Sequence, residues 1–211
     1  RENDIPLYGL ESGDSIKDFD MIGFTMQYEM SYTNVLNMLD LAGLPVRSKD
    51  RTDLTPIICA GGPCVCNPEP IADFIDIFTP GEGEEIVNEL IDLLEKHKKL
   101  GSTKLEFLRE AAQLEGVYVP AFYDVNYNDD GTIKEVVNRE NAPKIVKKRI
   151  ISDLNTVFYP ENFVVPFIEV VHDRAVSEIF RGCIRGCRFC QAGFIYRPIR
   201  EKTSDVINKQ A

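Results

Sequence analysis

The stretch Pro56-Ile57-Ile58-Cys59-Ala60-Gly61-Gly62-Pro63 runs from a continuous apolar segment into a glycine turn. A short apolar run that ends at a turn is typical of a strand buried on both faces of a parallel sheet. Residues 21–26 and 74–78 have the same character and predict two further strands. Apolar residues at helical spacing follow two of these runs: those at about 31–41 follow the run 21–26, and those at about 82–97 follow the run 74–78. This alternation predicts a parallel sheet with helices on both faces.

The predicted fold class is therefore α/β, with a doubly wound, Rossmann-like parallel-sheet domain over residues 1–115. A short strand is expected at residues 5–11, and a second helix at about 103–114, after the break at Gly101-Ser102. Residues 116–170 are predicted to form a β-hairpin and a linker.

The hairpin is predicted from a turn sequence between two strand-like segments. Residues 117–127 and 132–137 flank Asn128-Asp129-Asp130-Gly131, and such turn residues favour a tight reversal of the chain. Basic and apolar residues alternate at 144–151, which is the pattern of a half-exposed strand.

Three cysteines lie close together in Arg181-Gly182-Cys183-Ile184-Arg185-Gly186-Cys187-Arg188-Phe189-Cys190. A closed zinc site needs four ligands, and an electron-transfer cluster needs four cysteines. Three thiolates on one loop instead suit a [4Fe-4S] cluster whose fourth iron binds a ligand that is not protein. Gly182 and Gly186 are expected to let the loop wrap closely, since glycine reaches positive φ freely. The alternatives are a zinc loop or three unrelated thiols.

This run resembles the signature of the radical S-adenosylmethionine (SAM) enzymes, C-x3-C-x-aromatic-C, with Phe189 in the aromatic position. The resemblance implies that Cys183, Cys187 and Cys190 ligate the cluster and that its open iron binds SAM. An electron from the cluster then cleaves SAM and releases a 5′-deoxyadenosyl radical. Phe189 is expected near the SAM adenine. An electron donor such as a flavodoxin or a ferredoxin is also implied, whereas no substrate follows from the resemblance.

Residues 171–211 are expected to begin a partial (β/α) barrel. Residues 177–180 predict its first strand, which would deliver the cysteine loop at its carboxyl end, where the active sites of barrels lie. Thr203-Ser204-Asp205 predicts the start of a helix. The chain begins at Arg1 and ends inside this helix, so we expect a fragment that holds only the first βα unit of the barrel and is inactive alone.

Two glycine-containing turns lie at the predicted carboxyl ends of the sheet strands, where ligands bind in such sheets. Gly61-Gly62-Pro63 and Gly81-Glu82-Gly83-Glu84 resemble the N-terminal cobalamin-binding-like domain that precedes many radical SAM barrels. The resemblance implies a ligand site at Gly61, Gly62, Gly81, Glu82 and Gly83, with cobalamin as the candidate. Tight strand-to-helix turns also need glycine without any ligand.

The histidines do not match the pattern of that domain. Its D-x-H-x-x-G run, which carries the cobalamin-ligating histidine, is missing from this sequence. His97 lies in a basic helix end and is expected to face solvent, and His172 lies beside the predicted barrel strand. The order of the segments nevertheless resembles the uncharacterised radical SAM proteins with an N-terminal cobalamin-binding-like domain.

The net charge of −10 is distributed unevenly. Residues 181–202 hold six basic side chains and one acidic side chain, a net charge of +5. This segment is either a basic surround for a negatively charged cluster or anionic substrate, or a solvated basic loop. The acidic remainder argues against broad nucleic-acid binding, although the local basic patch could still meet RNA. RNA therefore stays a possible substrate that no other feature of the sequence supports.

The cysteine content indicates a reducing compartment. Six cysteines are too few for a disulfide scaffold, and free thiols with an oxygen-sensitive cluster suggest the cytoplasm. No apolar run approaches a membrane span, and no signal peptide is expected. Cys59, Cys64 and Cys66 are either a second metal site or ordinary buried thiols. The alternative function is a binding module for cobalamin or a nucleotide, with the cysteine loop holding a structural metal.

Overall fold

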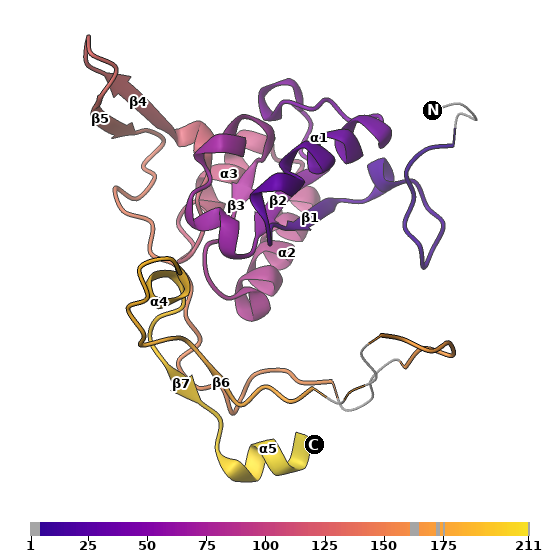
Figure 1. The fold of residues 1–211 in the computed structure, drawn as a ribbon. Helices are drawn as coiled ribbons and strands as arrows, with labels where there is room; N and C mark the ends of the chain where they lie inside the picture. The colour runs from indigo at the N-terminus through magenta and orange to yellow at the C-terminus, as the bar shows by residue number, and fades with distance from the viewer. Residues whose placement is uncertain (1–4, 161–164, 172–173, 175, 211) are drawn as a thin grey trace. The chain divides into compact units, whose positions relative to one another are not determined.

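The computed structural model describes residues 5–160, 165–171, 174 and 176–210 (Figure 1). The chain divides into two compact units, Arg1–Arg149 and Ile150–Ala211. No helix in the described ranges combines the length and the apolar character that a membrane span requires.

The first unit is built on a three-stranded parallel sheet. Its strands are β1 (Met21–Thr25), β2 (Ile57–Gly61) and β3 (Ile77–Phe78), in the spatial order β1-β2-β3. The register pairs Ile22 with Ile58 and Cys59 with Ile77. This α/β arrangement confirms the predicted Rossmann-like parallel sheet. β1 is only partly buried, because it lies at the edge of the sheet and has one neighbouring strand.

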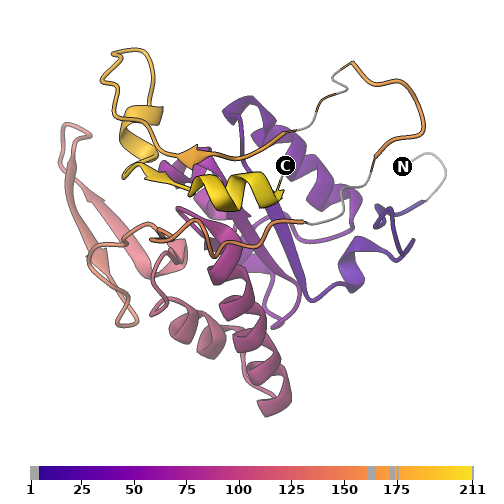
Figure 2. The same ribbon diagram turned by 90° about the horizontal axis from the view of Figure 1, so that it is seen from below.

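Helices cover both faces of the sheet, as Figures 1 and 2 show. Alternate residues of a strand point to opposite faces, so β2 supplies Ile58 to one core and Ile57 to the other. α1 (Tyr32–Leu41) packs on the Ile58 face, whereas α2 (Gly83–Leu100) and α3 (Lys104–Ala111) pack on the Ile57 face. Each buried aliphatic side chain contributes about 1.5–3 kcal/mol before the entropic cost of ordering it.

Short 3-10 helices connect these elements: η1 (Ile16–Asp18), η2 (Glu29–Ser31), η3 (Ser48–Asp50), η4 (Pro63–Cys66), η5 (Glu69–Phe74) and η6 (Pro120–Phe122). The strand predicted at 74–78 is therefore too long, because its first residue belongs to η5. The predicted strand at 5–11 is also wrong. In the described part of that segment the chain makes one isolated bridge, from Tyr8 to Ser15.

The predicted hairpin is confirmed. β4 (Tyr123–Tyr127) pairs antiparallel with β5 (Ile133–Asn138), and Gly131 in the turn has a φ of 82°. All six residues of β5 are exposed. The strand predicted at 144–151 is wrong, because within it only Arg149 pairs with the sheet region, through a bridge to Gly81. A segment whose basic and apolar residues alternate forms a β-strand only where a neighbouring strand is present to pair with its backbone.

The segment before β4 joins the core instead of extending the hairpin. Val117, Val119 and Phe122 are buried in the cluster that contains α2 and α3. Tyr118 forms an antiparallel bridge with Phe78 of β3. The hydrophobic core of the first unit therefore continues beyond residue 115.

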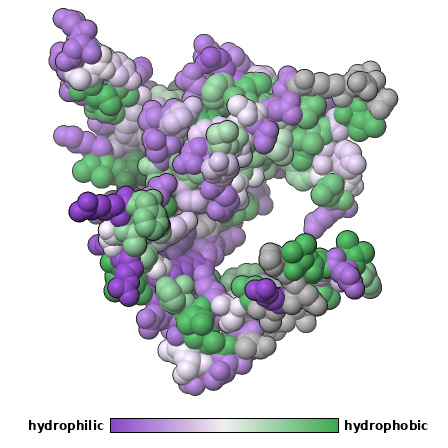
Figure 3. All heavy atoms as spheres, viewed as in Figure 1, coloured by the Kyte–Doolittle hydropathy of each residue, from purple (hydrophilic) through white to green (hydrophobic). Residues whose placement is uncertain are grey.

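The second unit contains β6 (Phe180–Arg181), α4 (Ala192–Ile195), β7 (Arg200–Glu201) and α5 (Ser204–Gln210). β6 pairs antiparallel with β7, and the described residues of this unit hold no parallel pair of the kind expected for a barrel. Large apolar side chains of this unit remain exposed, including Phe167, Ile184, Phe189 and Phe194. On the face of the molecule drawn in Figure 3, hydrophobic and hydrophilic residues are interspersed.

Candidate functional site: the cysteine loop and the sheet edges

The cysteine loop runs from β6 to α4 in the second unit. The amide of Cys183 donates to the carbonyl of Tyr196 at 3.0 Å, and that of Cys190 donates to the carbonyl of Cys187 at 3.2 Å. Cys187 is exposed, and Cys183 and Cys190 are half-buried. The aromatic ring at Phe189 is 94% exposed.

The backbone approaches other parts of the chain closely at Gly182 and Gly193, whereas the sequence suggests Gly182 and Gly186. Gly182 has a φ of 112°, and a Cβ there would lie 2.7 Å from the carbonyl oxygen of Pro198. A Cβ at Gly193 would lie 2.2 Å from the carbonyl oxygen of Arg185. Gly186 has no neighbour within 4 Å of its Cβ position and no positive φ, so the positive φ expected at both glycines is observed at Gly182 and not at Gly186.

The three thiols lie on one loop, but their sulfur atoms do not lie close together. Among the residues that the structure describes, no three Cys, His, Asp or Glu side chains lie close enough to form a metal site. All six cysteines are free thiols. The donor set on the loop has the chemistry that a cluster needs, but its sulfur atoms do not converge in this conformation.

The basic residues around the loop fall into two groups, those that pair with a carboxylate and those that do not. Arg181 pairs with Glu178 at 2.6 Å, and Lys202 lies 3.2 Å from the same carboxylate. These contacts link the residues before β6 to the residue after β7, and the pairing lowers the pKa of Glu178, chiefly through the hydrogen bond from Arg181. Arg185 and Arg188 are exposed, with no ion-pair partner among the described residues.

The glycine turns at the carboxyl ends of β2 and β3 approach the backbone of the chain itself. Gly62 has a φ of 94°, and a Cβ there would lie 2.8 Å from the carbonyl oxygen of Met26. Gly81 has a φ of 109°, and its Cβ would lie 2.1 Å from the carbonyl oxygen of Arg149. A Cβ at Gly61 would lie 3.1 Å from the hydroxyl of Thr79.

Arg149 fixes the chain beside the second of these turns. Its amide donates to the carbonyl of Pro80 at 2.9 Å, and its carbonyl accepts from the amide of Glu82 at 3.1 Å. Its guanidinium pairs with Glu85 at 2.7 Å and with Glu89 at 2.5 Å. Internal packing therefore explains the glycine at position 81, whereas a Cβ at Gly83 would make only an ordinary contact. The ligand site proposed for these turns stays a prediction.

His97 is buried, contrary to the expectation from its basic neighbours. Its Nε2 lies 3.1 Å from a carboxylate oxygen of Glu110, and its ring packs edge-on against Phe107 with 5.7 Å between centroids. The helical period places His97 on the same face as the buried Leu94, whereas the neighbouring lysine Lys98 points to solvent. His172 lies outside the described residues.

Cys59 and Cys64 face opposite sides of the sheet. Cys59 packs in the core with α2 and α3, and Cys64 packs in the core with α1. Burial raises the pKa of both thiols, so both stay protonated at neutral pH. These positions do not support a metal site shared with the exposed Cys66.

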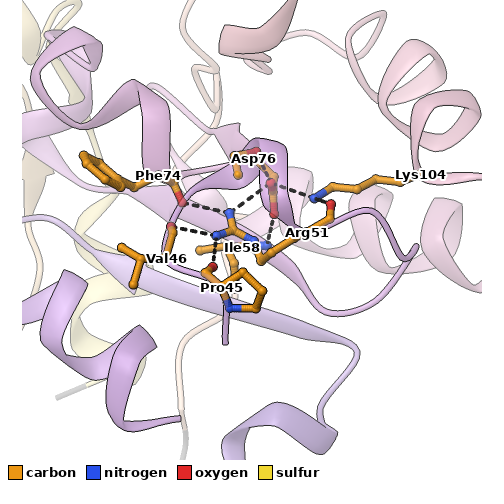
Figure 4. Close-up of polar contacts among 8 residues, drawn as sticks. Pro45, Val46, Arg51, Ile58, Phe74, Asp76 and Lys104 are labelled. Atoms are coloured by element: carbon orange, nitrogen blue, oxygen red, sulfur yellow. Dashed lines mark hydrogen bonds and ion pairs between the residues drawn. The ribbon is translucent and has the colours of Figure 1, made fainter. Parts of the chain in front are cut away.

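Sequence reasoning missed a buried ionic cluster at the opposite edge of the sheet (Figure 4). One oxygen of Asp76 accepts from Arg51 at 3.0 Å, from Lys104 at 2.9 Å and from the hydroxyl of Ser48. The other oxygen accepts from the amide of Ile58 at 2.8 Å. A charged residue inside the apolar run 75–78 was the available signal, because a buried charge needs partners.

Arg51 connects this carboxylate to three backbone carbonyls. It donates to Pro45 at 2.8 Å, to Val46 at 2.9 Å and to Phe74 at 2.8 Å. These bonds tie the segment before β2 to the segment before β3, as Figure 4 shows. The Arg51-Asp76-Lys104 cluster thus positions the amino-terminal edge of the sheet.

Residues 1–120 match the protein family described as "Radical SAM proteins, N-terminal". The chain belongs to this family. Membership in the radical SAM N-terminal family carries a general expectation of SAM and an iron–sulfur cluster. The match covers residues 1–120 and ends before the cysteine loop. It therefore describes the first unit directly, and it concerns the loop only because members of the family are radical SAM proteins.

The chain is also similar to an uncharacterized protein of Methanocaldococcus jannaschii, with 28% identity over 207 residues. The alignment covers 97% of this chain and 37% of that relative, so the chain spans just over a third of the relative's length. No solved structure matches the chain.

Proposed function

We propose that Cys183, Cys187 and Cys190 hold a [4Fe-4S] cluster and that the intact protein cleaves SAM reductively to start radical chemistry on a substrate. The observation that carries this proposal is the C-x3-C-x-Phe-C loop in a chain whose N-terminal part belongs to a radical SAM family. Held by these three thiolates, the cluster would supply one electron to SAM and would leave one iron open to a ligand. The three thiols must move together to hold it.

The surroundings of the loop support this assignment. The close approaches at Gly182 and Gly193 keep the loop compact, and the exposed ring of Phe189 offers a flat apolar surface for an adenine base. Arg185 and Arg188 place unpaired positive charge next to three thiolates, which offsets the negative charge of the site. The six free thiols agree with a reducing compartment such as the cytoplasm.

The proposal includes an electron donor of the flavodoxin or ferredoxin type, because reductive cleavage of SAM needs an external electron. Cobalamin is a secondary candidate for the glycine turns of the first unit. His97 is excluded as its axial ligand in this conformation, since its Nε2 is engaged with Glu110 in a buried contact. Any cobalamin bound here is expected to lack a His97 ligand.

Anaerobic reconstitution with iron and sulfide tests the cluster. The wild-type chain is expected to bind about four irons and to show a broad brown absorbance band. Replacing Cys183, Cys187 or Cys190 with Ala should remove both signals. Cys66→Ala is the matched control, because it removes an exposed thiol of the first unit. Full iron content in Cys187→Ala, or equal loss in Cys66→Ala, would contradict the assignment.

Binding of SAM is tested separately on the reconstituted intact protein. Electron paramagnetic resonance of the reduced cluster should change when SAM is added, and Phe189→Ala should raise the SAM concentration needed for that change. A spectrum that ignores SAM in the full-length protein would leave a cluster without the proposed open iron. That result would favour the alternative of a binding module with a structural metal loop.

A further inference from the structure

A pocket of about 400 Å³ lies at the amino-terminal edge of the sheet, beside the Arg51-Asp76-Lys104 cluster. This volume is within the range of small-molecule sites. The pocket is formed by η3, η5, η6 and the first turns of α3. Its floor is apolar and includes the buried side chains Ile75, Leu108 and Phe122.

The charge around this pocket is opposite to that of the unit that contains it. Residues 1–149 hold 16 basic and 27 acidic side chains, a net charge of −11. Four of those basic residues line the pocket, namely Arg47, Lys49, Arg51 and Lys104, against a single acidic residue, Asp73. Basic residues are therefore concentrated around this pocket, although the first unit as a whole is acidic.

The buried part of this positive charge is only partly balanced. Arg51 and Lys104 share one buried carboxylate, Asp76, and electrostatic attraction to Asp53 also acts on Lys104, so Asp76 alone does not balance both cations. Loss of water from an uncompensated charge is costly, and a nearby anion reduces that cost. The cluster thus favours negative charge in the adjoining pocket.

The cations at the pocket mouth are available to a ligand. Lys49 is exposed and has no ion-pair partner among the described residues. Arg47 pairs with Asp73 at 2.6 Å, but the two side chains are 48% and 72% exposed. An exposed pair of this kind is weak, so a bound anion can replace Asp73.

We propose that this pocket binds a small organic anion. Its apolar body packs on Ile75, Leu108 and Phe122, and its carboxylate or phosphate group is held by Arg47 and Lys49. The pocket lies at the edge of the sheet opposite the glycine turns, and all of its lining residues belong to the first unit. It is therefore a site separate from the cysteine loop and independent of the function proposed for that loop.

Two aromatic anions test the proposal on the chain of residues 1–211. We would titrate 1-naphthyl phosphate and 1-naphthoate and follow the methyl resonances of Ile75, Leu105 and Leu108 by NMR. Saturable shifts at these methyls are expected for at least one anion, and the relative affinities separate a phosphate site from a carboxylate site. Inorganic phosphate and neutral 1-naphthol should each bind at least about fivefold more weakly, because each lacks one of the two interactions.

Four single substitutions are expected to change the affinity for the anion in different directions. Arg47→Gln and Lys49→Gln should each weaken binding about five- to tenfold, whereas Asp73→Asn should tighten it severalfold by releasing Arg47. Lys134→Gln removes a charge from the exposed strand β5 and should leave binding unchanged. Because these side chains are on the surface, circular dichroism should show the folded state in every variant.

Two results would overturn the proposal. One is the absence of saturable binding by either anion. The other is binding that is unaffected in the Arg47→Gln/Lys49→Gln double variant, which would place the anion elsewhere.

Discussion

At the scale of single residues, Asp76 has the largest consequence for stability. Its side chain is fully buried, and Arg51 and Lys104 are nearly so. Burial lowers the pKa of Lys104, and Asp76 opposes that effect. Removing the negative charge leaves two nearly buried cations without the carboxylate that balances them.

We therefore expect Asp76→Asn to lower the free energy of unfolding by about 3–5 kcal/mol, as for other broken buried ion pairs. Urea denaturation of the chain of residues 1–211 measures this change. Asp73→Asn is the matched control, because it makes the same replacement in an exposed pair and should cost less than about 1 kcal/mol. Similar costs for the two variants would show that the buried cluster is not important for stability.

Glu178 should make the second unit sensitive to acid. Its pKa is lowered in the folded state, so its contribution is present above the ordinary glutamate pKa of about 4.3 and is lost as the pH falls through the lowered value. The protection of the Arg181 and Lys202 amides against exchange, corrected for the intrinsic slowing of exchange in acid, should therefore fall as the pH drops from about 5 to about 3. Glu178→Gln should exchange faster at neutral pH and show a flatter dependence, whereas Glu201→Gln should behave like the wild type.

At the scale of elements, α3 depends on its first turn. The hydroxyl of Thr103 accepts from the amide of Glu106, and the Glu106 carboxylate accepts from the amide of Thr103. This reciprocal cap satisfies two amides that a helix start leaves unpaired. Thr103→Ala is expected to cost about 1 kcal/mol in chemical denaturation, and Thr103→Ser should restore most of it. An equal loss in both variants would argue against the cap.

The cysteine loop should tolerate a side chain at one glycine and reject it at another. Gly182 has positive φ and contacts the backbone of Pro198 and Ile199, whereas Gly186 has open space around its Cβ position. Gly182→Ala should therefore reduce the iron content after reconstitution severalfold, and Gly186→Ala should leave it near that of the wild type. The reverse order would show that the loop closes differently when it binds the cluster.

At the scale of the whole molecule, the extent of the first unit matters for its stability. The boundary predicted at residue 115 excludes Val117, Val119 and Phe122, which are buried against α2 and α3. It also excludes Arg149, whose backbone bridges Gly81 and whose guanidinium binds two glutamates of α2. Two separate parts of the chain beyond 115 thus complete this fold.

We expect a chain of residues 1–149 to unfold cooperatively on heating, and a chain of residues 1–115 to melt without a sharp transition. Loss of three buried apolar side chains at about 1.5–3 kcal/mol each is comparable to the total stability of a domain. Calorimetry or circular dichroism distinguishes the two chains. A cooperative transition in the shorter chain would support the boundary at 115.

Much of the secondary structure follows from local patterns in the sequence. The apolar runs at β1 and β2, the helical spacing in α1 and α2, and the turn residues of the hairpin each predict the element that forms. These signals are readable because they depend on neighbours a few residues apart. The spacing of Cys183, Cys187 and Cys190 is local in the same sense, and it is sufficient for the radical SAM resemblance that the family match supports.

Other features depend on contacts between distant residues. Asp76 meets Arg51 and Lys104, which are 25 and 28 positions away, and the pocket beside them exists only once η3, η5, η6 and α3 pack together. The burial of His97 and the contact of Gly81 with Arg149 are decided in the same way. A linear pattern gives the chemical type of a residue, whereas burial and partners depend on which segments the fold brings together.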